Sequence, residues 1–149
     1  MRNFLIVILG LIITVPSFSQ SKKGDDILGE WFTENNEAKV EIYKSGDKYY
    51  GKIIWLKEPN DKETGKPKKD KNNPDTKLKD RSIIGMNFVN AFKFDGDDVW
   101  EDGTVYDAKS GKTYSGTIGF EAKDKLKLRG YIGKSWMGLG RTTYWTRTN

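Results

Sequence analysis

Much of this chain alternates between apolar and polar residues with a period of two, and short turns rich in glycine and aspartate separate the alternating runs. Residues 38–43 and 48–56 form one such pair around a turn at 45–47, and residues 112–120 are followed by a similar run at 125–132. A period of two places every second side chain on the same face of a β-strand, and closely spaced runs are typical of hairpins. The pattern therefore predicts an all-β fold of about eight short antiparallel strands.

Strand edges constrain how these strands are arranged, because an unpaired edge promotes aggregation and closure of the sheet removes it. We therefore expect a small antiparallel up-and-down barrel, and a two-sheet sandwich remains the alternative. A barrel that holds a ligand would have a cavity of roughly 300 Å³ or more, open at one end. In a solid barrel the alternation would place five large side chains at the centre: Tyr49, Trp55, Tyr114, Phe120 and Leu128.

One long polar segment, residues 57–82, interrupts the alternation. It contains three of the four prolines, and residues 57–81 carry nine basic and six acidic side chains. A loop of this length is either functional or mobile. Its mixture of charges is typical of a solvated loop, so we do not expect nucleic acid as a partner.

The first 19 residues have the pattern of a secretory signal peptide, with Arg2 before an apolar run at 4–15 and Pro16 after it. The run is about twelve residues long, whereas a helix that spans a bilayer needs about 20. We predict cleavage between Ser19 and Gln20, export to the periplasm or out of the cell, and no transmembrane span in the mature chain. Residues 20–27 would be a flexible leader and residues 28–149 a single domain.

The composition excludes several kinds of chemistry. The 149 residues include no cysteine and no histidine, so thiol redox centres, Ser-His-Asp triads and ordinary zinc or haem sites are excluded. We expect a monomer without a cofactor.

Two groups of polar and aromatic residues are candidate sites. The first centres on Asp107, which could form a polar cluster with neighbouring tyrosines and an arginine. Its candidate ligand-binding residues are Trp100, Tyr106, Asp107, Tyr114, Arg129 and Arg81. The second group, Asp70, Asn73 and Asp75, offers oxygen ligands for Ca²⁺. An Asn-Pro-Asp run more often forms turns that fix the shape of a loop, so we expect no metal site.

Gly29 and Trp31, together with a late arginine, resemble the Gly-x-Trp pattern of the calycin barrels, the lipocalin and fatty-acid-binding group. That resemblance implies that the tryptophan closes one end of the barrel while the arginine lies across its ring. Arg147 is the matching arginine and Arg141 the second choice.

A second resemblance extends over nearly all of the predicted mature chain, to the bacterial family catalogued as domain of unknown function 2147. It is carried by Gly29-Glu30-Trp31, Asn73-Pro74-Asp75, Leu78, Arg81, Gly85, Trp100, Gly103, Tyr106-Asp107, Ser110-Gly111-Lys112-Thr113-Tyr114, Leu126, Arg129-Gly130-Tyr131, Gly138-Leu139-Gly140-Arg141 and Trp145. The resemblance implies a short exported protein with one domain, and it brings no established activity.

Three classes of function remain open. The first is a non-catalytic barrel that binds a small apolar or amphipathic ligand, or an envelope glycan, and we favour this class. The second is a solid barrel that acts as a structural or stress-related interaction protein through its long loop. The third is a hydrolase that uses paired carboxylates.

Overall fold

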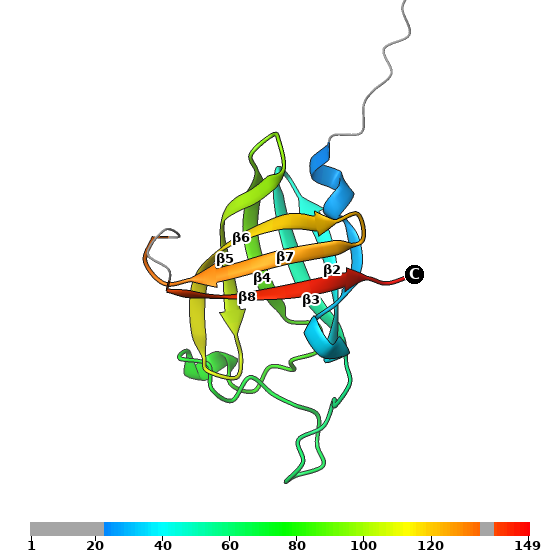
Figure 1. Cartoon of the computed structure of the whole chain (residues 1–149). Coiled ribbons are helices and arrows are strands. Elements are labelled where there is room, and N and C mark those ends of the chain that lie inside the picture. Colours follow the sequence, from blue (N-terminus) through cyan, green and yellow to red (C-terminus); the bar gives the residue numbers. More distant parts are fainter. Residues whose placement is uncertain (1–22, 135–138) are drawn as a thin grey trace, which may run out of the picture.

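The computed structural model describes residues 23–134 and 139–149, which form a closed antiparallel barrel (Figure 1). Each strand pairs with the next one along the chain, and β8 pairs with β1 through Trp31–Arg147 and Phe32–Thr146. The up-and-down barrel is thus confirmed, and the sandwich alternative is wrong. The predicted signal peptide and its cleavage site lie outside the described residues. The strands are β1 (Gly29–Phe32), β2 (Ala38–Ser45), β3 (Lys48–Leu56), β4 (Asn87–Phe94), β5 (Val99–Asp107), β6 (Lys112–Ala122), β7 (Lys125–Tyr131) and β8 (Gly140–Arg147).

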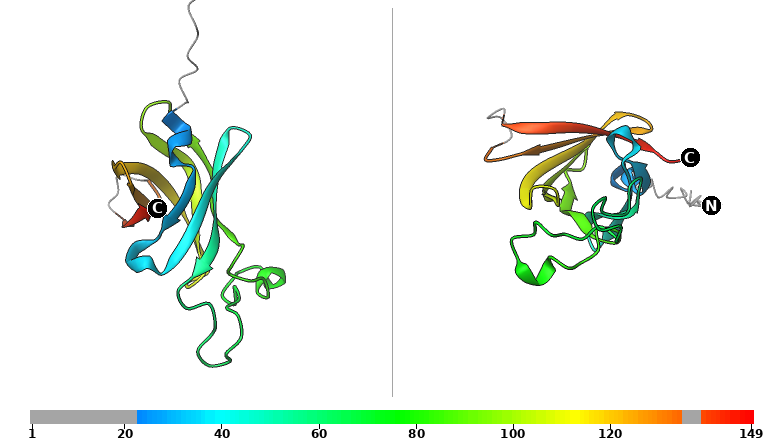
Figure 2. Two further views of the ribbon diagram at one scale, coloured as in Figure 1. Left: turned by 90° about the vertical axis from the view of Figure 1, so that its right-hand side faces the viewer. Right: turned by 90° about the horizontal axis from the view of Figure 1, so that it is seen from below.

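The two ends of the barrel differ in their connections. Tight turns join β2 to β3, β4 to β5 and β6 to β7 at the end that carries the 3₁₀ helix η1 (Lys23–Ile27), and we call this the closed end. The opposite, open end carries η2 (Glu34–Asn36) and the long connection from β3 to β4, residues 57–86, which contains η3 (Thr76–Leu78). We call this connection the 57–86 loop. Figure 2 shows η1 and this loop at opposite ends of the molecule.

The segment expected to be a flexible leader is partly ordered. Residues 23–27 form η1, and the Ile27 side chain is completely buried in the core. The Ile27 carbonyl accepts a hydrogen bond of 2.9 Å from the indole nitrogen of Trp31. The prediction missed this helix because a single apolar residue after polar residues shows no periodicity. None of the helices in the described ranges is long and apolar enough to cross a bilayer.

The closed half of the barrel is solidly packed. Its core cluster joins η1 to all eight strands. The Phe92 ring of β4 fills the centre because the next two strands, β5 and β6, carry Gly103 and Gly116. A Cβ atom on Gly103 would overlap the Phe92 ring, and one on Gly116 would lie 2.9 Å from it. The buried members of the cluster are Ile27, Trp31, Val40, Ile42, Tyr49, Val89, Phe92, Trp100, Ile118, Leu126, Leu128 and Trp145.

Bulges change which side chains point inward, and they correct one prediction. Val40 pairs with Ile53 and Lys39 pairs with Trp55, so β3 has one extra residue at this point. The extra residue reverses the alternation, and Trp55 is 42% exposed instead of central. A second irregularity, with Ala91 and Asp102 both near φ 58°, separates the regular ends of the β4–β5 pair.

Candidate functional site

A cavity of about 1550 Å³ occupies the open half of the barrel and extends under the 57–86 loop. Leu128 and Trp145 belong to the packed core and also line the cavity, so they form its floor. The Phe88 ring lines the cavity too, 5.8 Å from the Trp145 ring. The barrel is therefore solid in its closed half and hollow in its open half.

The walls of the cavity are mostly apolar. Ile53 comes from β3 and Val105 from β5, while Ile83 and Met86 come from the end of the 57–86 loop. The hydroxyl of Tyr114, which also lines the cavity, has no hydrogen-bond partner among the described residues. This combination of apolar walls and a few available polar groups is typical of sites for small molecules.

Charged side chains surround the mouth of the cavity. Eight of them are basic and six are acidic, and several form ion pairs across the rim. Lys71 lies 3.4 Å from Asp61, and Lys69 lies 3.2 Å from Asp80. The basic excess makes the mouth suited to the negative group of an amphipathic molecule whose apolar part lies inside.

A buried carboxylate attaches the 57–86 loop to the barrel. Asp70 is completely buried, and its oxygens accept hydrogen bonds from the Tyr106 hydroxyl (2.6 Å), the Asn73 amide (2.7 Å) and the Arg81 Nε (2.8 Å). A second nitrogen of the Arg81 guanidinium lies 2.8 Å from the same carboxylate. We call these four residues the Asp70 cluster. Because Tyr106 belongs to β5, the cluster joins the loop to the rim of the barrel.

In the Asp70 cluster, burial, hydrogen bonds and the charge of Arg81 together determine which groups donate hydrogen bonds and which accept them. Burial by itself would raise the pKa of Asp70, but the hydrogen bonds from Tyr106, Asn73 and Arg81 and the charge of Arg81 hold the pKa below its usual value. Burial and the bond to Asp70 raise the pKa of Tyr106 to about 12. At neutral pH the carboxylate is therefore ionised and the tyrosine remains a donor.

The structure corrects the predicted polar cluster around Asp107. That carboxylate caps the β5–β6 turn instead, where it accepts hydrogen bonds from the Lys109 backbone nitrogen (3.0 Å) and the Ser110 hydroxyl (2.7 Å). The acceptor for Tyr106 and Arg81 is Asp70, which lies 36 positions from Tyr106. No local pattern in the sequence distinguishes Asp70 from the other aspartates of the loop.

The other predicted ligand-binding residues lie in different places. Tyr106, Tyr114 and Asp107 line the cavity or its mouth, whereas Trp100, Arg81 and Arg129 do not. Trp100 is buried in the closed half, and its ring centroid lies 4.8 Å from that of Phe94. The aromatic side chains Phe88 and Trp145, on the other hand, line the cavity and were not among the predicted site residues.

The three residues considered for calcium do not present their oxygens to a common point. The guanidinium of Arg81 takes the place beside Asp70 that a cation would occupy. Asn73 donates its amide to Asp70, and Asp75 caps η3 by accepting a hydrogen bond from the Lys77 nitrogen (3.0 Å). Within the described residues, no three or more aspartate or glutamate side chains gather to hold a metal ion.

At the closed end, Trp31 and Arg147 make the contact that the calycin resemblance implies. The Arg147 guanidinium lies 4.1 Å from the centroid of the Trp31 ring, a cation–π distance. It also donates hydrogen bonds to the carbonyls of Leu28 (3.0 Å) and Asp26 (2.6 Å). Gly29 adopts φ 119°, a conformation that favours glycine.

Arg141, the second choice for this contact, does not take part in closing the barrel. It lies at the open end, with its side chain largely exposed and 3.7 Å from Glu34.

Comparisons with known proteins agree with this architecture. The chain is similar to a solved structure described as "Protein HP1028 from the human pathogen Helicobacter pylori belongs to the lipocalin family". The two are 28% identical, with a TM-score of 0.68, and the match covers 82% of each chain. No curated protein matches the chain significantly. The model of a bacterial family described as "Uncharacterized protein conserved in bacteria (DUF2147)" matches residues 29–147. The chain therefore belongs to the DUF2147 family and has a lipocalin-like barrel.

Proposed function

We propose that this protein is a non-catalytic binding protein that holds a small apolar or amphipathic molecule in the open half of its barrel. The observation that carries the proposal is the cavity of about 1550 Å³ above the apolar floor formed by Phe88, Leu128 and Trp145. Pockets for small molecules usually measure about 300–1,000 Å³. The space is therefore sufficient for such a ligand together with water near the mouth.

The chemistry of the cavity favours an amphipathic molecule over a glycan. Its deep part consists of aliphatic and aromatic side chains, which stabilise a buried hydrocarbon group by about 0.8 kcal/mol per methylene. Charged groups are confined to the rim, where a polar head would remain in contact with water. A glycan would need polar partners along its whole length.

The acidic groups near the cavity support binding more than hydrolysis. Glu34 and Glu37 form ion pairs with Arg141 and Lys109 across the open end. Asp107 caps a turn, and Asp70 is fully occupied by its donors. A hydrolase with paired carboxylates would need two such groups converging on the substrate.

The first experiment is native mass spectrometry of the protein purified gently from its own source. We expect a monomer with an additional mass that is lost on denaturation. The denatured mass also tests our proposal that the protein is exported, because cleavage between Ser19 and Gln20 would leave a chain that starts at Gln20. A chain without any additional mass would count against tight storage of a ligand.

A substitution that fills the cavity gives a sharper test. Gly130 lines the cavity, and a Cβ atom there would meet only Tyr114, at 3.6 Å. Gly130→Phe therefore places a ring inside the cavity. The control is Gly119→Phe, because a Cβ on Gly119 has only the Asp98 carbonyl within reach, at 3.7 Å.

The readout for both variants is titration with anilinonaphthalene sulfonate, a small anionic amphipathic dye. Displacing about two methylene equivalents from the cavity costs about 1.6 kcal/mol, so Gly130→Phe should weaken dye binding by about fifteenfold. Gly119→Phe should leave the affinity unchanged. Equal affinities in folded Gly130→Phe and wild-type protein would contradict binding inside the cavity.

A further inference from the structure

We propose that the open end of the barrel docks onto the surface of an anionic phospholipid bilayer, with the mouth of the cavity facing the lipids. The proposal goes beyond ligand binding, because it concerns the rim of the open end as a contact surface. Part of this surface, Lys57, Lys66, Lys79, Ile132 and Leu139, also lines the mouth of the cavity. Two independent features of that surface support it: the positions of exposed apolar side chains, and an excess of lysines without acidic partners.

Exposed apolar side chains gather at the open end. Among the described residues, six large apolar side chains are exposed, and only Phe120 belongs to the closed half. The other five lie around the mouth, at the end of β3, in the 57–86 loop and in the connection from β7 to β8. They are Trp55, Leu78, Ile84, Ile132 and Leu139. Single exposed apolar residues are common on soluble proteins, but their concentration at one end indicates an interaction surface.

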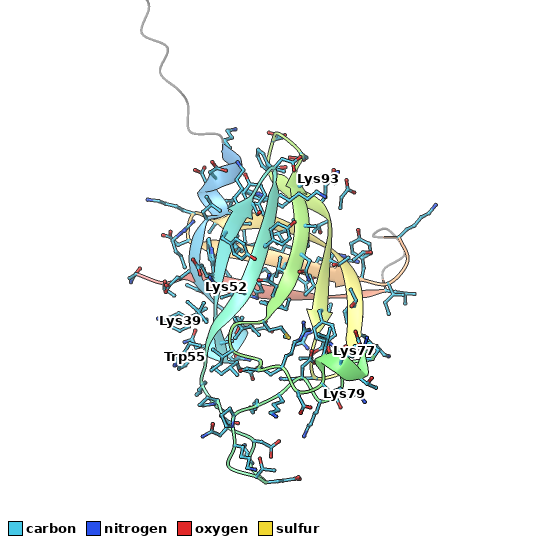
Figure 3. All side chains as sticks on the ribbon, turned by 180° about the vertical axis from the view of Figure 1, so that it is seen from behind. Lys39, Lys52, Trp55, Lys77, Lys79 and Lys93 are labelled. Atoms are coloured by element: carbon cyan, nitrogen blue, oxygen red, sulfur yellow. The ribbon has the colours of Figure 1, made fainter. Side chains whose placement is uncertain are left out.

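The 57–86 loop adds positive charge to the same end. Five of its nine basic side chains form ion pairs within the loop: Lys62, Lys68, Lys69, Lys71 and Arg81. The remaining four, Lys57, Lys66, Lys77 and Lys79, have no acidic partner among the described residues. Figure 3 shows Lys77 and Lys79 at the end of the barrel where Trp55 lies, away from Lys93 at the opposite end of β4.

The local arrangement of these groups suits a lipid surface better than a soluble polyanion. Exposed Leu78 lies between Lys77 and Lys79 in and beside η3. An apolar side chain at this position can enter the acyl boundary while the neighbouring ammonium groups contact lipid phosphates. A soluble polyanion would engage the lysines but would provide no apolar phase for the leucine and isoleucine side chains.

The Asp70 cluster holds the loop in the conformation that presents these groups. The Asn72 amide adds a hydrogen bond of 2.8 Å to the Lys109 carbonyl in the β5–β6 turn. The loop is thus attached to the rim of the barrel at two points, at Tyr106 in β5 and at Lys109 in the following turn. The backbone that carries its lysines therefore does not need to be ordered when it meets a membrane. A preorganised surface loses less entropy on binding.

The test is sedimentation of the protein with vesicles that contain phosphatidylglycerol, compared with vesicles of phosphatidylcholine alone. A chain from residue 20 onward is suitable, because β1 and β8 close the barrel within residues 29–147. Such a chain also lacks the apolar run at 4–15, which would itself bind lipid. We expect binding to the anionic vesicles that weakens as the salt concentration rises.

Two triple variants distinguish vesicle binding through the open end from vesicle binding through the overall positive charge of the protein. Neutralising Lys57, Lys77 and Lys79 to glutamine should weaken vesicle binding on the order of a hundredfold, since each lysine near an anionic surface contributes about fivefold. The matched control neutralises Lys93, Lys123 and Lys127, three exposed lysines in the closed half that form no ion pair with another described residue. This control should retain nearly full binding.

A third variant, Leu78→Ser with Ile84→Ser, tests the apolar contribution. Neither residue lines the cavity, so this variant should lose vesicle binding and still bind the dye in solution.

Several results would overturn the proposal. Equal loss in both triple variants would show general electrostatic attraction, and capture by dextran sulfate without vesicle binding would identify a soluble polyanion as the partner. Dye binding without any vesicle binding would refute docking and leave the proposed ligand site intact. Vesicle binding by Gly130→Phe without dye binding would, in contrast, support docking and show that it does not require an occupied cavity.

Discussion

Asp70 offers the most direct test of how the 57–86 loop is held over the mouth of the barrel. Replacing it with alanine removes the acceptor of three hydrogen bonds and leaves the Tyr106 hydroxyl and the Arg81 guanidinium without a partner. The variant should therefore be less stable, with the 57–86 loop detached from the barrel.

The size of the effect follows from which groups can reach water afterwards. A buried hydroxyl left unpaired costs about 1–3 kcal/mol, and a hydrogen bond to a charged group contributes about 1.5–3 kcal/mol. The Arg81 side chain is 34% exposed and can be hydrated after the substitution. The loss of its ion pair with Asp70 therefore adds less to the cost. We expect Asp70→Ala to lower the free energy of unfolding by about 3 kcal/mol, or roughly 10 °C in Tm.

Urea denaturation followed by tryptophan fluorescence measures this change. The control is Asp80→Ala, since the Asp80 side chain is 92% exposed and 3.2 Å from Lys69; a surface pair of this kind contributes less than about 1 kcal/mol. A double-mutant cycle with Tyr106→Phe should give a coupling energy of at least about 1 kcal/mol. The reasoning fails if Asp70→Ala and Asp80→Ala unfold at the same urea concentration.

The remaining predictions concern pH and the closed half. The pKa of Asp70 is lower in the folded chain than in the unfolded chain. The Asp70 carboxylate therefore contributes fully to stability above its unfolded pKa of about 3.9. This contribution is lost as the pH falls through the pKa of the folded chain. The stability gap between wild type and Asp70→Ala, measured by urea denaturation, should be constant from neutral pH to about pH 5 and shrink under stronger acid; a gap that grows in acid would contradict this sign. Gly103→Ala should cost about 1–3 kcal/mol because the new Cβ overlaps Phe92, while Gly119→Ala should change thermal stability little. Arg147→Ala should lower Tm by more than Arg147→Lys, since lysine keeps the charge near Trp31 but not both backbone hydrogen bonds. Equal Tm values for the two variants would contradict this prediction, because they would show that the charge kept by lysine contributes nothing to stability.

Local patterns predicted most of the fold. The alternation at 38–43 and 48–56 predicts two strands whatever surrounds them, because a period of two directs every second side chain to one face. The turn at 45–47 predicts their antiparallel pairing. Closure of the barrel was expected because it removes unpaired strand edges. Trp31 and Arg147 lie together as the Gly-x-Trp resemblance implies.

The candidate site was less predictable, because it depends on small changes of geometry and on contacts between distant positions. One extra residue in β3 reverses the alternation, so Trp55 points outward while Leu56 lines the cavity. The hollow half of the barrel likewise depends on long-range packing, because the packed core stops at the Phe88 and Trp145 side chains and the cavity begins there.

The sequence by itself determined most of the strands, the hairpins between them and the polar character of the long loop, since each of these depends on neighbours within a few residues. Only the tertiary structure decided which aspartate is buried and which half of the barrel is hollow. Asp70 is one of several similar aspartates in the sequence, and it becomes an acceptor for Tyr106 only because the fold brings the loop onto β5. Burial of a charge and the space left inside a barrel are properties of packing, and packing is set by residues far apart along the chain.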